Sequence, residues 1–560
     1  MLEQLKAYFG FDRFLPLQEE IITKVLAKRD TLVLMPTGGG KSLCYQLPAL
    51  RLKGLTLVVS PLIALMKDQV DGLRADGVPA GLLNSTLAAQ EANQVQDQAR
   101  QGKIKILYVA PERLALPGFQ RFLQSLDVSL IAIDEAHCIS EWGHDFRPDY
   151  RNLKSLRRDF PGVPVIALTA TATEPVREDI VNQLGLDKPE IFISSFNRPN
   201  LTYTIQPKAE PLGSLLHLLE KHQGGSAIIY RFSRKATEET ALELSERGFS
   251  ALPYHAGLER DLRRETQEKF IRDQVQIVVA TIAFGMGIDK PDVRFVAHVG
   301  VPKSIEGYYQ ETGRAGRDGD PSQAVMFWGA GDFATARQRL AEVDETRRAA
   351  ERTRLDALAG LVETAECRRA VLLRHFGEHP PASCGNCDNC LEQPDVTDAT
   401  ELARKLLSAV YRTGQSFGMG HLQKVLTGSE DERVRQRGHD RLSVFGIVEP
   451  AEAVMLQPLS RALQARGDLV ANEHGGLALG GSARAILKGE SAVQIVVPPK
   501  RRRGRRGDMT PNPVGDPLFE ALRALRKELA EDAQVPPYVI FHDSTLREMA
   551  AARPATLDQL

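Results

Sequence analysis

Short runs of β-branched and other apolar residues recur along the first 340 positions, and amphipathic stretches separate them. Continuous apolar runs of this length are typical of strands covered on both faces, as in parallel α/β sheets. We predict strands at Thr31–Leu34, Leu55–Ser60, Ile104–Val109, Leu130–Asp134, Pro164–Thr169, Ser226–Tyr230, Gln276–Ala280 and Phe295–Val299. The pattern breaks at 197–207, which contains Pro199 and Pro207. It therefore predicts two α/β halves of comparable size.

Length and charge limit the possible functions. The 560 residues suggest roughly three to five domains, and 26% charged with 42% hydrophobic residues is ordinary for globular chains. The formal net charge is -1, so any contact with a polyanion must come from local basic patches. The chain has no run of 18 or more apolar residues and no signal-peptide pattern at its start. We expect a cytoplasmic protein without a membrane span.

A glycine-rich segment follows the first predicted strand. It reads Met-Pro-Thr-Gly-Gly-Gly-Lys-Ser and contains Thr37, Gly38, Gly39, Gly40, Lys41 and Ser42. Glycines let the backbone curl so that its N–H groups face phosphate oxygens, Lys41 adds a positive charge, and the Ser42 hydroxyl can ligate Mg²⁺. Met35 stands where the strict phosphate-loop pattern has a glycine. Taken alone, the segment therefore fits an ordinary strand-to-helix turn about equally well.

An Asp-Glu-Ala-His segment at 134–137 follows the fourth predicted strand. Asp134 is placed to hold Mg²⁺ through the water shell that this ion keeps, and Glu135 is placed to orient and deprotonate the attacking water. Two such motifs in this order, both at strand ends, favour a nucleoside triphosphate site over a coincidental glycine turn.

The second half carries Gln310 to Gly319, which reads Gln-Glu-Thr-Gly-Arg-Ala-Gly-Arg-Asp-Gly. Arg314 and Arg317 are three positions apart and so share a face if the segment is helical. An arginine from a neighbouring domain stabilises charge on a transferred phosphoryl group and links nucleotide occupancy to domain closure. The alternative is a solvated arginine pair, which the motifs of the first half make less favourable.

Four of the six cysteines have the spacing C-x16-C-x2-C-x2-C, at Cys367, Cys384, Cys387 and Cys390. In a chain expected to be cytosolic, this density indicates metal rather than disulfides, and four thiolates form a closed structural Zn²⁺ site. The alternative, unliganded thiols on a turn, is less favourable because the segment is too polar for a core. Cys44 and Cys138 are interpreted as plain buried thiols.

The order of these motifs resembles that of superfamily 2 helicases. Motif I corresponds to Thr37–Ser42, Ia to Val58–Asp68, II to Asp134–His137, III to Thr169–Thr173, V to Ala280–Asp289 and VI to Tyr308–Gly319. Three further features resemble the RecQ family of DNA helicases: a motif 0 at 10–21, an aromatic-rich loop at 138–150 and the four cysteines after the motor. Where that family commonly has Phe-Arg-Pro in motif 0, this chain has Phe14-Leu15-Pro16.

The resemblance implies roles for particular residues. Gln18 would read the adenine edge with Phe11 against the ring, and His137 would couple the nucleotide site to the other domain. Single-stranded DNA would be sensed by Trp142, His144, Phe146 and Arg147, in agreement with the use of aromatics and arginine for stacking unpaired bases. Gln310, Arg314 and Arg317 would complete the ATP site, with Arg317 as the finger.

The resemblance also implies an α/β fold: two RecA-like parallel-sheet motor domains, a helical zinc-binding module, a winged-helix domain and a partial helical HRDC domain. The expected boundaries are 1–200, 201–340, 341–395, 396–490, a basic flexible linker at 491–515, and 516–560 for an HRDC domain that looks shortened. The linker contains Lys-Arg-Arg-Arg-Gly-Arg-Arg at 500–506, which would attract phosphates without regard to sequence.

Two features of the expected winged-helix domain are candidates for duplex contact. Arg433, Arg437 and Arg441 align on one helical face, and such a stripe would track phosphates, although a solvated charged face fits the spacing equally well. The strand-separating hairpin of the family should lie near 469–479, with His474 as a candidate for its tip.

The sequence therefore predicts an ATP-dependent DNA helicase that requires Mg²⁺ and Zn²⁺. The resemblance implies 3′ to 5′ movement on single-stranded DNA, forked duplex substrates, and work in recombination, repair, replication-fork processing and the SOS response. It also implies single-stranded-DNA-binding protein and other repair proteins as partners. Two alternatives stay open, an RNA helicase and a DNA-binding or strand-annealing protein with a degenerate motor; intact Lys41, Asp134, Glu135 and Arg317 argue against the second.

Overall fold

The first of two parallel sheets holds the glycine-rich segment and the Asp-Glu-Ala-His segment. The computed structural model describes residues 1–61, 63–84, 87–141, 143, 145–208, 210–222, 225–281, 284, 290–471, 476–497, 516–533 and 535–556. The strand order is β3-β4-β2-β5-β6-β1-β7, and every pairing is parallel. The strands are β1 Thr31–Leu34, β2 Leu55–Val59, β3 Ala80–Leu83, β4 Ile106–Val109, β5 Val128–Ile133, β6 Val165–Thr169 and β7 Glu190–Ile193.

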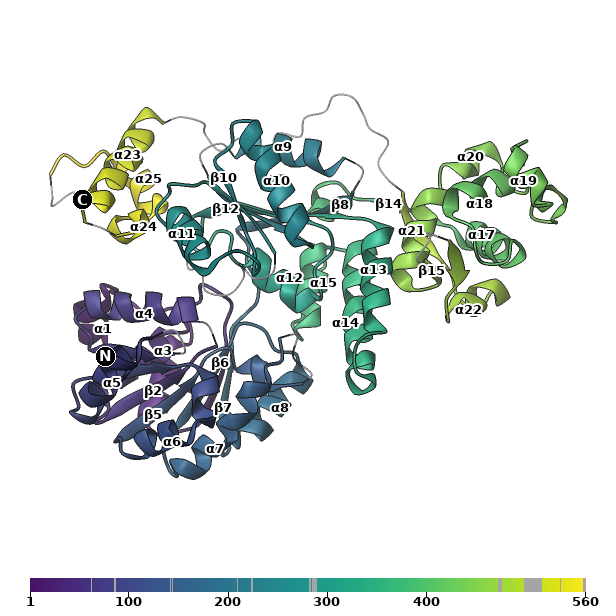
Figure 1. The fold of residues 1–560 in the computed structure, drawn as a ribbon. Helices are drawn as coiled ribbons and strands as arrows, with labels where there is room; N and C mark the ends of the chain where they lie inside the picture. The colour runs from purple at the N-terminus through teal and green to yellow at the C-terminus, as the bar shows by residue number, and fades with distance from the viewer. Residues whose placement is uncertain are drawn as a thin grey trace.

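Helices cover both faces of this sheet (Figure 1). Val33 packs on the side of α2, α3 and α4, whereas its neighbours Leu32 and Leu34 pack with α5 to α8. This alternation explains why the strands are apolar at every position rather than at every second one. The helices are α1 Leu2–Phe9, α2 Gln18–Leu26, α3 Leu43–Arg51, α4 Ile63–Ala75, α5 Ala89–Arg100, α6 Pro117–Gln124, α7 Lys154–Asp159 and α8 Glu174–Leu184.

The second sheet has the order β10-β11-β9-β12-β13-β8 and is also parallel throughout. Its strands are β8 Leu201–Pro207, β9 Ser226–Arg231, β10 Ala251–Tyr254, β11 Ile277–Ala280, β12 Val293–Val299 and β13 Ser322–Trp328. Two helices cover one face and three the other. They are α9 Pro211–Lys221 and α10 Arg234–Glu246, then α11 Arg260–Ile271, α12 Ile305–Thr312 and α13 Ala330–Leu340.

Three smaller units follow the second sheet. The first consists of α14 Glu345–Glu363, α15 Arg368–His375 and α16 Asp388–Leu391, and its apolar side chains continue the core of the second sheet. The next has a core of its own. It comprises β14 Asp395–Asp398, α17 Thr400–Arg412, α18 Met419–Leu426, α19 Glu432–Gln436, α20 Pro450–Ala453, α21 Leu456–Arg466, β15 Leu469–Ala471, β16 Leu477–Leu479, α22 Ala483–Lys488 and β17 Gln494–Val497.

The last unit contains α23 Pro517–Asp532, α24 Pro537–Ile540 and α25 Asp543–Ala552. Arg526 fastens these helices together, since its guanidinium pairs with Asp543 at 2.8 Å and donates to the carbonyl oxygen of Phe541. Arg547 pairs with Asp320 of the second sheet's domain. In Figure 1 this unit lies on one side of that domain and the unit of α17 to α22 lies on the other. No helix in the described part of the chain is long and apolar enough to span a bilayer.

The α/β class and all eight strands expected from the sequence are confirmed, but two expectations drawn from local patterns are wrong. The break at 197–207 is shorter than expected, because Leu201–Pro207 forms β8 at the edge of the second sheet, with alternate residues buried. Arg433, Arg437 and Arg441 do not share a helix: α19 ends at Gln436, and Gly438 takes a left-handed conformation with φ 70°. Spacing alone could not show this interruption.

Candidate active site

The glycine-rich segment connects the end of β1 to the start of α3. Gly38 and Gly40 have φ of 84° and 74°, a region that residues with a side chain rarely adopt. Gly39 donates its N–H to the carbonyl oxygen of Pro36 at 3.0 Å, and Ser42 stands at the N-terminal cap position of α3. The Nζ atom of Lys41 lies 3.1 Å from the carbonyl oxygen of Met35, inside the curl of the loop. The loop therefore gathers backbone donors, an ammonium and a hydroxyl at one helix N-terminus, which suits phosphates and Mg²⁺.

Asp134 and Glu135 follow β5, which lies between β2 and β6. The carboxylate of Asp134 accepts the N–H of Glu135 at 3.0 Å and faces the hydroxyl of Ser60 at 3.4 Å. Burial, and then the negative charge of Glu135, raise the pKa of Asp134 well above its usual range, while Lys41 opposes the shift. Glu135 has φ 46°, an unusual conformation for a residue with a side chain, and such strain is found where structure over-determines a functional position.

A chain of contacts joins this acidic pair to the second domain. The Oε2 atom of Glu135 lies 3.3 Å from Nδ1 of His137, and the same Nδ1 lies 2.9 Å from the hydroxyl of Thr169. The Thr169 hydroxyl in turn donates to the carbonyl oxygen of Thr171 at 3.2 Å. Gln310 of α12 then donates its amide to the Thr171 hydroxyl at 3.1 Å. The path therefore leads from Glu135 in the first domain to Gln310 in the second.

Arg314 and Arg317 are not on a helix, contrary to the expectation from their spacing. The helix α12 ends at Thr312, and the chain continues in turns through Gly313, Gly316 and Gly319. Positive φ at Gly316 and Gly319 (57° and 87°) is incompatible with a continuing helix. Arg314 is 7% exposed and lies close to Tyr230, inside the second domain.

Arg317 instead lies against the phosphate loop of the first domain. Its Cβ and Cγ atoms are 3.5 Å from the position that a Cβ atom would take at Gly38. Between the two domains runs Arg198, which donates to the carbonyl oxygen of Thr37 at 3.3 Å and to that of Gly316 at 2.7 Å. Sequence reasoning missed Arg198; the available signal was a lone cation in a short segment between two parallel sheets.

The segment expected to sense DNA is only partly described, since Trp142 and His144 lie outside the described residues. Two guanidinium groups lie over the ring of Phe146, that of Arg151 at 5.1 Å and that of Arg347 on α14 at 5.4 Å from the ring centroid. Arg147 pairs with Asp145 at 3.2 Å and donates to the carbonyl oxygen of Pro61 at 3.0 Å. The loop is thus tied both to the segment after β2 and to the helix that follows the motor.

The segment before α2 packs onto the phosphate loop. Gln18, which is 2% exposed, accepts the N–H of Leu15 at 2.8 Å and donates to the carbonyl oxygen of Gly40 at 3.0 Å. Its amide must leave these partners if it is to read an adenine edge. Phe11 is 57% exposed.

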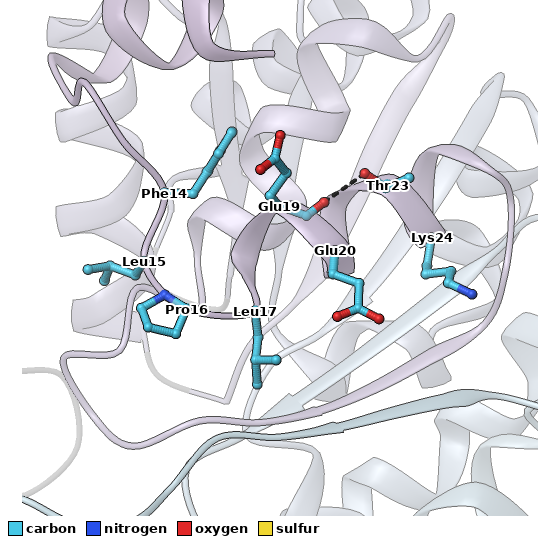
Figure 2. Close-up of a pocket in the computed structure, with 8 residues that line it drawn as sticks. All are labelled: Phe14, Leu15, Pro16, Leu17, Glu19, Glu20, Thr23 and Lys24. Atoms are coloured by element: carbon cyan, nitrogen blue, oxygen red, sulfur yellow. Dashed lines mark hydrogen bonds between the residues drawn. The ribbon is translucent and has the colours of Figure 1, made fainter.

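Beside this segment is an open pocket of about 650 Å³ (Figure 2). Its apolar wall comes from Phe14, Leu15, Pro16 and Leu17, and its other side from residues of α2: Glu19, Glu20, Thr23 and Lys24. Leu15 also reaches the phosphate loop, since its Cδ1 lies 3.4 Å from the position of a Cβ at Gly40. The departure from arginine at this position therefore places an apolar wall next to the nucleotide site.

The four clustered cysteines fit a zinc ion. All four Sγ atoms lie within 4.8 Å of one another, and two of the separations, Cys384 to Cys390 and Cys367 to Cys387, are 3.9 Å. Tetrahedral Zn²⁺ with Zn–S bonds of about 2.3 Å requires S···S separations of about 3.8 Å. Backbone N–H groups of Ala370 and Asn386 each lie 3.4 Å from a sulfur, as thiolates prefer. The segment that carries these cysteines contacts β8, since Asp388 accepts the N–H of Ile205 at 2.8 Å.

The predicted hairpin is a short antiparallel pair, β15 with β16, in which Leu469 pairs with Leu479 and Ala471 with Leu477. His474, the candidate tip, lies outside the described residues, as does the basic run at 500–506. The winged-helix unit does contain a half-buried aromatic cluster: the Phe417 ring stacks on His421 with centroids 4.3 Å apart, and Arg437 lies 6.0 Å from the Phe417 centroid.

Five family models match the chain in one order. They are DEAD/DEAH box helicase at 15–179, Helicase conserved C-terminal domain at 208–319, RecQ zinc-binding at 330–391, RQC domain at 393–504 and HRDC domain at 516–560. The four cysteines fall inside or at the edge of the zinc-binding match, which agrees with their geometry.

Two relatives are similar over nearly the whole chain. The ATP-dependent DNA helicase RecQ of Haemophilus influenzae is 44% identical, over 99% of this chain and 91% of that protein. The protein of the same name from Bacillus subtilis is 39% identical, over 99% of this chain and 94% of that protein. Among solved structures, Mycobacterium smegmatis helicase Lhr bound to single-stranded DNA and AMP-PNP is similar in fold, with a TM-score of 0.50, 19% identity, and 87% of this chain and 61% of that chain covered.

Proposed function

The chain belongs to the RecQ family, and we propose from that premise that it is an ATP-dependent DNA helicase. It couples ATP hydrolysis to 3′ to 5′ movement along single-stranded DNA and unwinds forked duplexes. The observation that best supports a working motor is the approach of Arg317 to the phosphate loop, because its Cβ and Cγ atoms lie next to Gly38 and an arginine of the second domain therefore adjoins the nucleotide site of the first.

The residues of the site have distinct roles in this proposal. The loop from Thr37 to Ser42 binds the phosphates, with Lys41 as the cation. Asp134 would hold Mg²⁺ through its water shell, and the ion would supply positive charge to the phosphates when bound. Glu135 accepts the proton of the attacking water, and Arg317 stabilises charge on the transferred phosphoryl group.

Three further residues hold the catalytic groups in position: Arg314, Gln310 and His137. Arg314 supports the loop of Arg317 from inside the second domain. Gln310 and His137 relay domain closure to Glu135 through Thr169 and Thr171, since a change in domain spacing must first break or make the Gln310 hydrogen bond at 3.1 Å. On the adenine side, Phe11 and Gln18 bind the base once the Gln18 amide turns away from the phosphate loop.

DNA enters this proposal through the aromatic-rich segment. Trp142, His144, Phe146 and Arg147 contact single-stranded DNA, and Arg147 transmits the contact through its bond to Pro61 and through the adjoining Cys138 to His137. Aromatic and arginine side chains stack unpaired bases without preference for sequence.

We assign the boundaries 1–200 and 201–340 to the motor domains, 341–395 to the zinc module, 396–490 to the winged-helix domain, 491–515 to the basic linker and 516–560 to the HRDC domain. Zinc bound by the four cysteines would hold the zinc module folded against β8. We further propose that the protein acts in recombination, in repair and at replication forks. It would work in a bacterial nucleoid, with single-stranded-DNA-binding protein among its partners.

ATP hydrolysis measured with and without single-stranded DNA, and with matched single-stranded RNA, tests the proposal. We expect strong stimulation by DNA alone, abolished in Glu135→Gln, and unwinding of a duplex with a 3′ tail but not a 5′ tail. Equal stimulation by RNA would favour an RNA helicase. No stimulation by either, with strand annealing intact in Lys41→Ala, would favour a DNA-binding protein with a degenerate motor.

A further inference from the structure

The segment between the two sheets runs from the end of β7 at Ile193 to the start of β8 at Leu201, and Arg198 lies near its end. The guanidinium of Arg198 donates to four carbonyl oxygens. Three belong to the loop after α12, namely Gly313 at 3.4 Å, Ala315 at 3.0 Å and Gly316 at 2.7 Å. The fourth is Thr37 of the phosphate loop, at 3.3 Å. One side chain therefore spans the two halves of the nucleotide site.

We propose that Arg198 is a positioning residue for ATP hydrolysis, which holds the loop of Arg317 in register with the phosphate loop. The inference rests on the proposed helicase function and deepens it. Arg198 lies against backbone oxygens rather than phosphates, so its effect is exerted through Arg317.

The three carbonyls of the second domain explain why an arginine is needed. They lie in the turns beyond Thr312, the last residue of α12, and the positive φ of Gly316 rules out a continuing helix whose N–H groups would bond them. A cation is favoured at a helix C-terminus, and the planar fork of arginine can serve several acceptors at once. Lysine keeps the charge but lacks the fork. The loop conformation that presents Arg317 is thus fastened by the Arg198 fork.

The segment that carries Arg198 is itself held in place. Glu378, which follows α15, accepts the hydroxyl of Ser195 at 2.9 Å and the N–H of Phe196 at 2.5 Å. The Phe196 ring stacks on Phe376 with centroids 4.6 Å apart, and the Tyr309 hydroxyl of α12 donates to the Phe196 carbonyl oxygen at 2.8 Å. The backbone that carries Arg198 is therefore held in place by these contacts.

The distribution of partners indicates how Arg198 responds to domain movement. With three bonds to the loop after α12 and one to Thr37, the guanidinium stays with the second domain when the domains separate. The Thr37 bond then breaks and reforms in each cycle, together with the bond from Gln310 to Thr171. The hydrogen bonds of Arg198 thus change with closure of the two domains, at the same loop that carries Arg317.

The test compares Arg198→Ala and Arg198→Lys with two controls. Arg74→Ala removes an arginine that also donates to a carbonyl, that of Ala80 at 2.9 Å, but within the first domain. Asn200→Ala removes an amide that donates to the same Gly316 oxygen at 2.8 Å and to the carbonyl oxygen of Asp320 at 2.9 Å, both within the second domain. ATP affinity is measured with a fluorescent ATP analogue, and kcat and KM are measured with saturating single-stranded DNA.

We expect Arg198→Ala to lower kcat by about tenfold to a hundredfold, because a displacement of about 1 Å in a positioned group costs that much, while ATP affinity stays within threefold of wild type. Arg198→Lys should recover only part of the loss, and Asn200→Ala should have a clearly smaller effect. If Arg198→Ala does not fold, Arg198→Lys decides, and a kcat equal to that of wild type in that variant overturns the inference.

A double-mutant cycle with Arg317→Ala separates this role from a general structural one. If Arg198 acts through Arg317, the double variant should hydrolyse ATP at the rate of Arg317→Ala alone. Multiplicative losses, or an equal loss of kcat in Asn200→Ala, would overturn the inference. An inactive wild-type protein would instead overturn the proposed function, so the two failures are distinguishable.

Discussion

Replacing Gly40 by alanine tests whether Gln18 fastens the motif 0 segment to the phosphate loop. A Cβ atom at Gly40 would lie 2.3 Å from Nε2 of Gln18, so the Gln18 side chain must move away. In moving, it loses its hydrogen bonds to the Leu15 N–H and the Gly40 carbonyl oxygen. Gly40 also has φ 74°, which adds backbone strain for any residue with a side chain.

The two contributions can be separated with a matched control. Gly162 has φ 82° in the same domain, and nothing lies within 4 Å of the position of its Cβ. Gly162→Ala and Gly40→Ala therefore share the left-handed strain of about 1–2 kcal/mol. Gly40→Ala alone also loses two hydrogen bonds of about 1 kcal/mol each. We expect the additional loss in the free energy of unfolding to be about 2 kcal/mol.

The assay is thermal unfolding of both variants without nucleotide, with ATP binding measured in parallel. For a domain of this size, an additional 2 kcal/mol corresponds to about 4–8 °C in Tm. Adding Gln18→Ala to Gly40→Ala should cost little more, since the bonds are already lost. If the two glycine variants unfold at the same temperature, or if Gln18→Ala destabilises both equally, the proposed fastening by Gln18 is refuted.

Four further predictions concern chemistry and coupling. Cys384→Ser should lose bound zinc and solubility, because a structural metal site contributes folding free energy. The control Cys44→Ser should retain the metal, and an unchanged zinc content of Cys384→Ser by atomic absorption would contradict the prediction. Glu135→Gln should bind ATP normally but hydrolyse it about 10²–10⁴ times more slowly, and a smaller loss in single-turnover kinetics would exclude Glu135 as the base. The raised pKa of Asp134 means that its carboxylate is protonated at a higher pH than usual. The apparent affinity for Mg²⁺ should therefore weaken as pH falls from 8 towards 6, and an affinity independent of pH would contradict this reasoning. Trp142→Ala should bind ATP but lose DNA stimulation, and full stimulation would show that this segment is not the sensor.

Local chemistry explains why so much of the site could be predicted. A phosphate loop needs glycines at fixed positions before a helix, and Gly38 and Gly40 do have positive φ. Four thiols can form a tetrahedral site only if their chain segments approach closely. The C-x2-C spacing already places neighbouring cysteines of one segment close together. The strands were evident because burial on both faces requires apolar residues at every position.

Interpretations that depended on extending a helix were less successful. The Arg314 and Arg317 pair and the stripe from Arg433 to Arg441 both assumed regular helical spacing. In each case a glycine with positive φ, Gly316 or Gly438, lies between the arginines and rules out one continuous helix. A single residue in the left-handed region redirects every side chain after it, so periodicity across a glycine carries little information.

The sequence by itself determined the α/β class, the two nucleotide motifs and the zinc ligands, because each depends on residue type and short-range spacing. Only the tertiary structure decided which side chains meet across the two sheets. The path from Glu135 to Gln310 and the four bonds of Arg198 join segments more than a hundred residues apart. Such contacts follow from how the sheets pack around the short segment between them, and no local pattern in the chain encodes that geometry.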